Sequence, residues 1–312
     1  DWLIPGVNDY DANFFIARLD ADGNFLWVDT AQLSTLPEDC LGWTLALSAD
    51  AIFVAGMHEA VWSSLRRYDY DGTLRAEKIL NIRTISDLAL DAEGWLYAVG
   101  TADSWAMFGN LPLPTPPTPT GYANFVVRLD SSLAAHWVHA TNYITFDEHP
   151  KVAVFEGKVF ALSNDFNQVT GCYQLKAYSP EGAMLWSDCI LPGTIPADYQ
   201  HFALQPFCDR LLLQYSSAGG MAVKAYDAGF GDTVLVQTSA ADFEGSFPFI
   251  CTNAGRAVFG SNFRNDGLVI NGDFTLLNDK TPVYQQFMLE FECPDASSGS
   301  ETPVAAAPRW CL

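Results

Sequence analysis

The sequence predicts an all-β fold built from repeated antiparallel sheets, and three observations support this prediction. A short alternating segment that ends in Leu-Asp or Tyr-Asp returns along the chain, and a second alternating segment lies between its copies. No segment shows a 3.6-residue apolar period with helix caps, so little helix is expected. Hydrophobic residues make up 49% of the 312 residues, which is enough for a sizeable core.

The first repeated segment occurs six times and sets the period. Its copies end at Asp20, Asp69, Asp130, Ser179, Asp227 and Glu292, which are 49, 61, 49, 48 and 65 residues apart. Each period holds two hairpins and therefore four antiparallel strands, named A to D from the innermost strand outward. A unit of about 50 residues with four strands has the size of one β-propeller blade. The predicted fold is a β-propeller of four-stranded antiparallel blades.

The propeller is predicted to occupy residues 1–293 with about five blades, or six or seven if the chain is part of a longer protein. The chain starts with strands C and D and ends with A, B and C. We therefore expect the hairpin at 14–30 to close the last blade and to displace residues 286–292. Residues 101–123, with a proline-rich stretch at 111–120, and residues 262–283 are expected to be long loops. Residues 294–312 are predicted to be a flexible tail or linker.

Charge and cysteine content limit the classes of partner and the location. The formal net charge is −21, which argues against nucleic acid and against an anionic membrane surface as partners. No apolar run approaches the roughly 18 residues that a membrane-spanning helix needs. Seven cysteines favour an oxidising, extracellular or cell-surface location.

Two disulfides are predicted from the repeat. A hairpin that turns at residues 180–181 would bring Cys172 opposite Cys189. Cys208 and Cys251 fall near the same turn of successive repeats and form the second predicted pair. Cys40, Cys293 and Cys311 remain unassigned.

The repeat also resembles a known family. Residues 14–27, Phe-Phe-Ile-Ala-Arg-Leu-Asp-Ala-Asp-Gly-Asn-Phe-Leu-Trp, are similar to the repeat of secreted bacterial β-propeller proteins of the SBBP type, which are common in Bacteroidetes exoproteins. Residues 107–113 and 270–276 resemble that family's lead-in to strand C. The resemblance spans most of residues 14–292 and implies a secreted propeller, but its motif carries no catalytic residue. Ser179 and Glu292 depart from the Leu-Asp ending, and Ala76 and Val234 replace the tryptophan.

The candidate ligand site lies in the loops that precede the innermost strands. Because the strands alternate in direction, these D-to-A connections and the B-to-C loops emerge on one face. The candidate ligand-binding residues on this face are Asp147, Glu148, His149, Asp198, His201, Asp242 and Glu244. A ring of carboxylates there is suited to a cation such as Ca²⁺, to a cationic ligand, or to the paired acids of a glycosidase. Loops of a chain with this net charge are, however, acidic in any case.

Three other recurring features are expected to be structural. Trp27, Trp137 and Trp186 lie at one position of three repeats, where packing between blades is favoured over stacking on a sugar. The acidic segments 20–24 and 69–73 resemble calcium loops but fall at C-to-D turns, where Asp and Gly serve the turn itself. Arg18, Arg67 and Arg128 recur in strand C and are expected to pair with acids or to cover apolar surface.

No catalytic signature accompanies the repeat. There is no nucleophile elbow, no phosphate-binding loop and no dinucleotide fingerprint, and no cofactor is implied. The sequence therefore favours a non-enzymatic extracellular binding or structural module that presents an acidic loop face to a protein or polysaccharide, alone or as a subunit of a larger assembly. The alternative is a carbohydrate-active hydrolase or lyase with paired carboxylates at the channel mouth.

Overall fold

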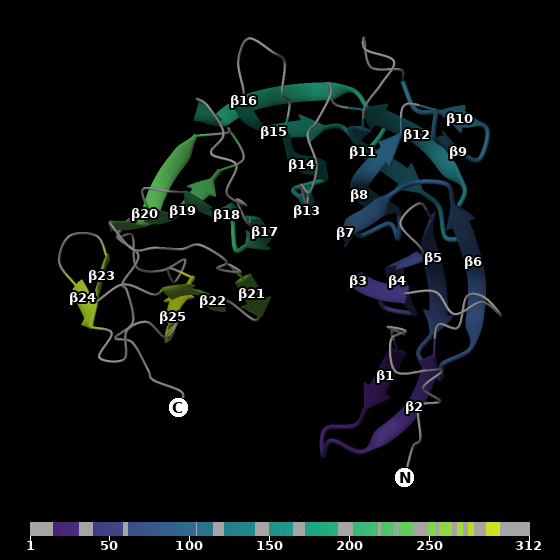
Figure 1. The fold of residues 1–312 in the computed structure, drawn as a ribbon, viewed down its shortest axis with the longest axis horizontal. Coiled ribbons are helices and arrows are strands. Elements are labelled where there is room, and N and C mark those ends of the chain that lie inside the picture. Colours follow the sequence, from purple (N-terminus) through teal and green to yellow (C-terminus); the bar gives the residue numbers. More distant parts are fainter. Residues whose placement is uncertain are drawn as a thin grey trace. The chain divides into compact units, whose positions relative to one another are not determined.

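The computed structural model of the chain is all-β (Figure 1). It describes residues 15–30, 40–58, 62–103, 105–114, 122–140, 150–164, 172–192, 202–217, 220–227, 229, 231–239, 249–253, 256–263, 267–270, 274–277 and 285–293. The chain divides into two compact units, residues 1–193 and 194–312. Every regular element in the described ranges is a strand, and these ranges contain no helix long and apolar enough to cross a bilayer.

Unit 1 contains a hairpin followed by three four-stranded sheets. The hairpin joins β1 (Phe15–Leu19) and β2 (Phe25–Thr30). Blade 1 consists of β3 (Cys40–Leu47), β4 (Ala51–His58), β5 (Trp62–Asp69) and β6 (Leu74–Leu80). Blade 2 consists of β7 (Thr84–Leu90), β8 (Leu96–Asp103), β11 (Tyr122–Leu129) and β12 (Ala135–Ala140). Blade 3 consists of β13 (Lys151–Phe155), β14 (Lys158–Asn164), β15 (Cys172–Tyr178) and β16 (Met184–Pro192).

Unit 2 contains two further sheets. Blade 4 consists of β17 (Phe202–Phe207), β18 (Arg210–Ser217), β19 (Gly220–Tyr226) and β20 (Asp232–Ser239). Two short strands, β23 (Gly267–Ile270) and β24 (Phe274–Leu277), extend this sheet beyond β20. Blade 5 consists of β21 (Phe249–Asn253), β22 (Arg256–Phe263) and β25 (Gln285–Glu292).

These sheets confirm the predicted fold class. Within every blade, neighbouring strands are antiparallel; blades 1 to 4 follow the order A, B, C, D, and the described strands of blade 5 follow the order A, B, C. Within a unit, successive blades pack through their first strands, β3 on β7, β7 on β13, and β17 on β21. Four-stranded antiparallel sheets stacked in this way are β-propeller blades. The number of blades in a closed ring stays a prediction.

Two expectations about strands need correction. The insertions at 101–123 and 262–283 are not purely loops, because β9 (Met107–Phe108) pairs with β10 (Leu111–Pro112) and β23 pairs with β24. In blade 5, β25 pairs with β22 over its full length, so the N-terminal hairpin does not displace residues 286–292. Closure of the last blade by residues 14–30, and the tail at 294–312, stay predictions.

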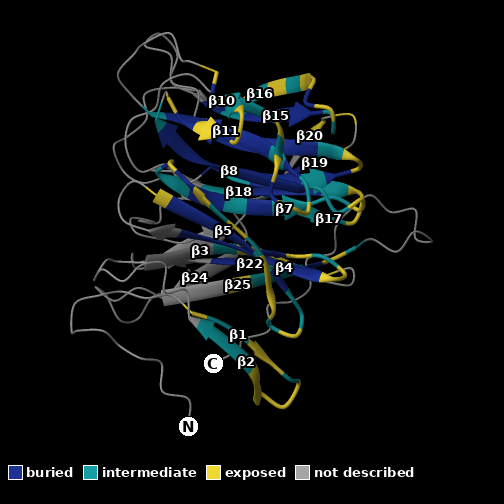
Figure 2. Cartoon of the chain, turned by 90° about the vertical axis from the view of Figure 1, so that its right-hand side faces the viewer, coloured by how far each residue is buried: buried dark blue, intermediate teal, exposed yellow. Residues whose placement is uncertain are grey.

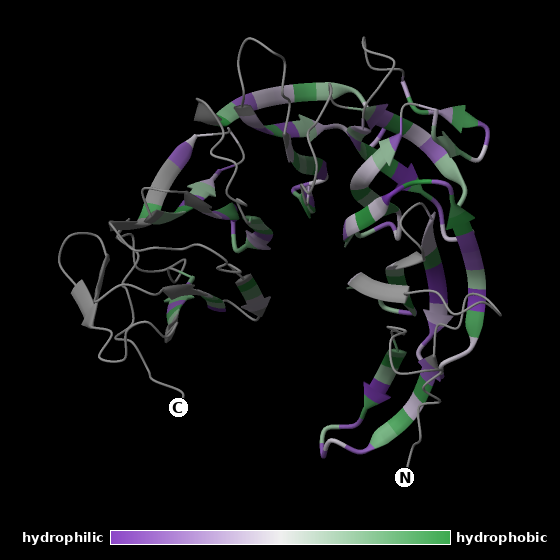
Figure 3. Ribbon diagram, viewed as in Figure 1, coloured by the Kyte–Doolittle hydropathy of each residue, from purple (hydrophilic) through white to green (hydrophobic). Residues whose placement is uncertain are grey.

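The core lies between blades and is made mainly by their second and third strands. In unit 1, Leu65, Leu96 and Phe125 belong to a cluster shared by blades 1 and 2, and Tyr97 and Val159 belong to one shared by blades 2 and 3. These middle strands are the most buried (Figure 2), whereas the outer strand β6 mixes hydrophilic and hydrophobic residues (Figure 3) and is mostly exposed or half-buried. The pattern is that of sheets covered on both faces and exposed at the outer edge.

The C-to-D turns use their aspartates as backbone acceptors. Oδ1 of Asp20, Asp130 and Asp227 accepts hydrogen bonds from the amides two and four residues further on, at 2.8–3.0 Å. Gly23 and Gly72 complete the first two turns with φ of 83° and 89°, which a residue with a Cβ adopts at a cost. The structure thus gives segments 20–24 and 69–73 the predicted turn role.

A tryptophan and an arginine of one blade form the same pair of hydrogen bonds to the next blade at two places in the chain. The indole Nε1 of Trp27 and a guanidinium nitrogen of Arg18 both donate to the carbonyl oxygen of Tyr70 in the next blade, at 2.9 and 2.6 Å. Trp137 and Arg128 donate in the same way to the carbonyl oxygen of Pro180, each at 2.8 Å. Packing between blades is therefore confirmed for Trp27 and Trp137.

The recurring arginines differ in the acceptors that they use. Arg67 pairs with Asp50 at 3.4 Å, as expected for a partner acid. Arg18 and Arg128 instead donate to carbonyl oxygens, and Arg128 also lies over the ring of Trp95 at 3.7 Å. All three have structural roles.

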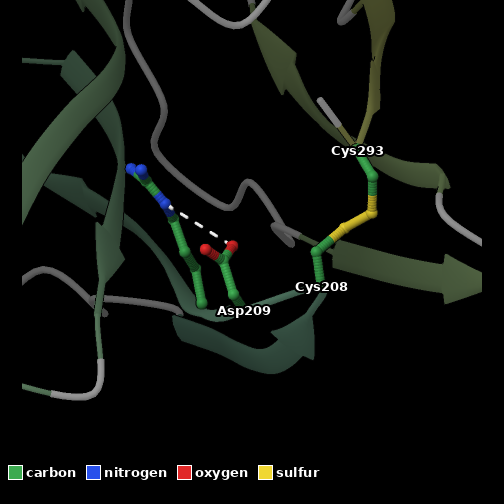
Figure 4. The surroundings of a disulfide bond; sticks show 4 residues. Cys208, Asp209 and Cys293 are labelled. Carbon is green, nitrogen blue, oxygen red and sulfur yellow. Dashed lines mark ion pairs between the residues drawn. A yellow bond between two sulfur atoms is a disulfide. The ribbon is translucent and has the colours of Figure 1, made fainter. Parts of the chain in front are cut away.

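A disulfide links Cys208 to Cys293 in unit 2 (Figure 4), with the two Cα atoms 6.2 Å apart. The predicted Cys208–Cys251 pair is wrong, and Cys251 is an exposed free thiol. Cys208 occupies the turn between β17 and β18 with φ of 55°, and Cys293 follows the end of β25, next to the β21–β22 turn. Both bonded cysteines therefore lie at the turn end of adjacent blades, whereas Cys251 lies inside β21 opposite Val258.

The second predicted disulfide is supported for one partner. Cys189 is disulfide-bonded, and its partner is outside the described side chains, so the Cys172–Cys189 bond stays a prediction. The expected direct opposition is wrong, because Cys172 pairs with Pro192, and Gln174 with Cys189. Two bulges in this hairpin shift the register away from the simple count of residues.

Replacing Cys208 and Cys293 together by serine is expected to lower the free energy of unfolding by about 4 kcal/mol, because the bond restricts an unfolded loop of 85 residues. Chemical denaturation under non-reducing conditions measures the loss. Cys251→Ser is the matched control and should stay within about 0.5 kcal/mol of the parent chain, since its side chain is exposed and unbonded. Equal stability of the double variant and the parent would show that the bond does not restrain this unit.

Candidate functional site

The predicted loop residues belong to three connections between blades that fall outside the described ranges. Residues 141–149, 193–201 and 240–248 connect the last strand of one blade to the first strand of the next, as predicted. All seven candidate residues fall outside the described ranges, namely Asp147, Glu148, His149, Asp198, His201, Asp242 and Glu244. Their role as a binding site stays a prediction, and the described neighbourhood begins at Pro150 and Lys151.

Three polar residues occupy one position on successive inner strands of unit 1. The tripeptides at 45–47, 88–90 and 152–154 pair with the second strand of their blades in equivalent registers. The residues just before these tripeptides are Thr44, Asp87 and Lys151, and all three are half-buried. Because β7 packs between β3 and β13, this position brings a hydroxyl, a carboxylate and an ammonium group to one region.

Asp87 joins the three blades through its carboxylate. Oδ2 accepts a hydrogen bond from the amide of Val152 at 3.0 Å, and Oδ1 accepts one from the amide of Leu88 at 3.1 Å. The hydroxyl of Thr44 lies 3.5 Å from Oδ1. Removal from water raises the pKa of Asp87, while the charge of Lys151 and these donors act in the opposite direction.

A bulge in β7 explains how the carboxylate reaches this place. The pairing of β7 with β8 shifts between Ile85 and Asp87, so that Ser86 is the extra residue. Ser86 is buried and its hydroxyl donates to the carbonyl oxygen of Pro150 at 3.0 Å. The bulge therefore ties β7 to Pro150, the residue that directly follows the 141–149 connection.

The contacts of Asp87 and Ser86 are suited to holding the start of β13, where the 141–149 connection ends. They do not form the pair of carboxylic acids that a glycosidase needs. Lys151 is the charged group that acts on the carboxyl of Asp87, so the described surroundings hold an acid beside a base. Within the described ranges, no group of three or more His, Cys, Asp or Glu side chains is placed to hold a metal ion. Asp87 and Lys151 were missed as site residues, although their position before the repeated tripeptides could have indicated them.

Asp87→Asn is expected to change the pH dependence of stability. Because folding raises the pKa of Asp87, its contribution is fully present below the unfolded value of 3.8 and is lost as the pH rises through the folded value. On acidification from pH 7 to pH 4, the free energy of unfolding of the parent chain should therefore rise relative to that of Asp87→Asn. At pH 7 the variant should also lose about 1 kcal/mol, since the new amide faces the Val152 amide donor.

Asp130→Asn is the matched control, because its effect on stability should depend on pH in the opposite direction. Hydrogen bonds from Ser132, Ala134 and His136 outweigh desolvation and lower the pKa of Asp130 to about 2. Its contribution is present above pH 3.8 and is lost as the pH falls through about 2, so the parent should lose its advantage over this variant on acidification. Denaturation curves from pH 2 to pH 7 measure both variants. Parallel pH profiles would contradict the assigned environments.

The fold described above is that of a β-propeller protein. No protein-family model and no curated protein matches the sequence. Similar solved structures include the Dos1 propeller, with 11% identity, a TM-score of 0.48, and coverage of 91% of this chain and 71% of that chain. A periplasmic gluconolactonase of Pseudomonas aeruginosa has 12% identity, a TM-score of 0.38, and coverage of 86% and 93%.

A third similar structure is an auxiliary nutrient-binding protein from Bacteroides ovatus. It has 12% identity, a TM-score of 0.41, and coverage of 85% of this chain and 71% of that chain. At these identities and TM-scores, none of the similarities transfers a function to this chain.

Proposed function

We propose that this chain is a non-enzymatic extracellular binding module whose acidic connections between blades capture a protein or glycan partner. The observation that carries this proposal is the use of Asp87. Its carboxylate accepts hydrogen bonds from the amides of Leu88 and Val152 and so fixes the base of the 141–149 connection. A rigid base that presents loops is what a binding surface requires.

The chemistry at the base of each connection differs between blades. Thr44, Asp87 and Lys151 stand at the same position, so neither a symmetric metal ring nor one repeated ligand contact is favoured there. The net charge of −21 favours a partner with basic groups, such as a cationic protein segment or an amino-sugar polymer. Asp147, Asp198 and Asp242 are the groups proposed to meet it, with Glu148, His149, His201 and Glu244 beside them.

We further propose a secreted protein of the SBBP repeat type, of Bacteroidetes-like origin, at the cell surface or outside the cell. The repeat at 14–27 and the Cys208–Cys293 bond support this, because disulfides persist in oxidising compartments. A subunit of a larger extracellular assembly is the form that suits a rigid module with one partner face.

Titration with soluble chitosan oligosaccharides and with a lysine-rich peptide, by calorimetry at two salt concentrations, tests the binding proposal. A variant carrying Asp147→Asn, Asp198→Asn and Asp242→Asn should bind at least tenfold more weakly than the parent chain. The control removes three exposed charges elsewhere, through Asp22→Asn, Asp50→Asn and Asp209→Asn, and should bind like the parent. Equal losses in both variants would mean that binding depends only on net charge and would refute a defined face.

The alternative is a carbohydrate-active hydrolase or lyase, and one observation favours it. The raised pKa of Asp87 is suited to a general acid, and Asp147 and Glu148 lie three and two residues before Pro150 in the sequence. Incubation with a panel of polysaccharides, followed by chromatography of the products, separates the two proposals. Products that disappear in both Asp87→Asn and Glu148→Gln would establish catalysis in place of simple binding.

A further inference from the structure

Two turns of the chain carry an Asp-Gly pair at the same position. In segments 20–24 and 69–73, the first residue donates to the carbonyl of the fifth, and the fourth donates to the carbonyl of the first, at 2.9–3.1 Å. The third and fourth residues of these turns are Asp22-Gly23 and Asp71-Gly72. An Asp-Gly pair is chemically reactive, because glycine has no side chain to keep its amide nitrogen away from the carboxyl carbon of the aspartate.

The reaction open to such a pair is isomerisation through a succinimide. The glycine nitrogen bonds to Cγ of the aspartate, a carboxyl oxygen leaves as water, and a five-membered ring forms. Water then opens the ring at either carbonyl and gives aspartate or isoaspartate, so water is the only co-reactant. In isoaspartate the main chain runs through Cβ and Cγ and is one CH2 group longer, which changes the backbone permanently.

The same turn occurs twice more with glutamate in place of the aspartate. Segments 91–95 and 179–183 form the same two backbone hydrogen bonds, at 2.8–3.2 Å, and carry Glu93-Gly94 and Glu181-Gly182. Glutamate could cyclise only to a six-membered ring, which forms much more slowly. This turn therefore accepts glutamate, and of the four turns only the two with aspartate are open to isomerisation.

Contacts around the second turn protect Asp71-Gly72. The carboxylate of Asp71 accepts a hydrogen bond from the amide of Thr73 at 2.9 Å. This bond, the side chain of Thr73 and the charge of Arg75 lower the pKa of Asp71. Ring closure expels water from the neutral carboxylic acid, so a lower pKa slows it. In addition, a Cβ at Gly72 would lie 2.8 Å from the ring of Trp27, so this ring covers the glycine.

Asp22-Gly23 has neither kind of contact within the described ranges. The side chain of Asp22 is exposed, and no described residue donates a hydrogen bond to its carboxylate. An added Cβ at Gly23 has no neighbour within 4 Å. In both turns the glycine amide is hydrogen-bonded, so the turn must open before the ring can close. The turn with fewer contacts is therefore the one that reacts.

We propose that Asp22-Gly23 is a site of spontaneous isoaspartate formation, and that the contacts of Thr73, Arg75 and Trp27 suppress the same reaction at Asp71-Gly72.

Isoaspartate at position 22 would act on the contact between the hairpin and blade 1. The turn sets the register in which Arg18 faces Trp27. Both side chains donate to the carbonyl oxygen of Tyr70, so a longer turn displaces the two donors from their common acceptor. Hydrogen exchange in β2 should therefore become faster as isoaspartate accumulates.

Incubation of the full chain at neutral pH for several weeks, followed by peptide mapping, tests the proposal. Fragmentation by electron transfer distinguishes isoaspartate from aspartate at each position. Isoaspartate should form at position 22 about tenfold faster than at position 71, because the second turn opens less often. Equal rates at the two positions, or a faster rate at position 71, would overturn the proposal.

Asp22→Glu is the variant that separates the chemistry from the fold, because two other turns of the chain already hold glutamate at this place. It should abolish isoaspartate in the hairpin and keep hydrogen exchange in β2 constant during the incubation. An equal increase of exchange in this variant and in the parent chain would refute the assigned consequence.

Trp27→Ala tests the protection of the second turn. It should raise the rate of isoaspartate formation at position 71 about threefold or more, because Gly72 loses the ring that covers it. Trp27→Phe keeps an aromatic ring and is the matched control, with a rate near that of the parent chain. An unchanged rate at position 71 in Trp27→Ala would overturn the protective role of the tryptophan.

Discussion

Gly100→Ala is expected to lower the free energy of unfolding by about 3 kcal/mol, because a Cβ at this position has no room. It would collide with the carbonyl oxygen of Thr84 and would lie 2.9 Å from the ring of Phe125. Gly100 is opposite Ile85, where the bulge at Ser86 begins, so the close approach of the two backbones is part of the bulge. Relief of the collision requires the backbone to move in a packed core, which is why the expected loss is large.

Gly94→Ala and Gly157→Ala separate this steric effect from conformational cost. Both glycines have positive φ, 85° and 68°, but an added Cβ at either has no neighbour within 4 Å. Each substitution should cost about 1 kcal/mol, from the left-handed backbone alone. Guanidinium denaturation of the three variants measures the difference. A loss for Gly100→Ala no larger than for these controls would mean that β7 yields easily, and the bulge would then not fix Asp87.

The repeat made the fold class predictable, because the features that define a blade are local. The alternation of strands, the Asp-Gly turns and the tryptophan at a fixed distance from the turn all lie within one hairpin. Each is confirmed by register, turn geometry or contact in the structure. The short strands β9, β10, β23 and β24 were missed because strands of only two to four residues carry too little alternation to be recognised.

Features that depend on two blades were harder to predict. The Cys208–Cys293 pairing follows from which turns meet at one end of adjacent blades, and counting residues within a repeat does not reveal it. The environment of Asp87 arises from β3, β7 and β13 together. The sequence signal that could have indicated it was the polar residue before each Leu-Ala-Leu or Val-Ala-Val tripeptide. The acidic loop residues remain predictions, because they lie outside the described ranges.

Trp137→Ala is expected to lower the free energy of unfolding by about 3 kcal/mol, because one side chain closes the contact between blades 2 and 3. Its ring lies 6.0 Å from that of Tyr97 and 6.1 Å from that of Tyr178, and its Nε1 donates to the Pro180 carbonyl. Truncation removes this burial and one of the two donors to that oxygen. Trp105→Ala is the matched control, since Trp105 is 69% exposed, and should change stability by less than about 0.5 kcal/mol.

A double-mutant cycle with Gly182 tests whether Trp137 stabilises the protein through its contact with the turn of the next blade. Gly182 has φ of 91°, and a Cβ there would lie 3.0 Å from the Trp137 ring, so Gly182→Ala should cost about 2 kcal/mol in the parent chain. In the Trp137→Ala background the ring is absent, and only the backbone cost of about 1 kcal/mol should remain. Strict additivity would mean that turn and ring do not touch in solution. Coupling would establish that the turn glycine and the tryptophan form one contact between blades. The same contact occurs between Trp27 of the hairpin β1–β2 and Gly72 of blade 1.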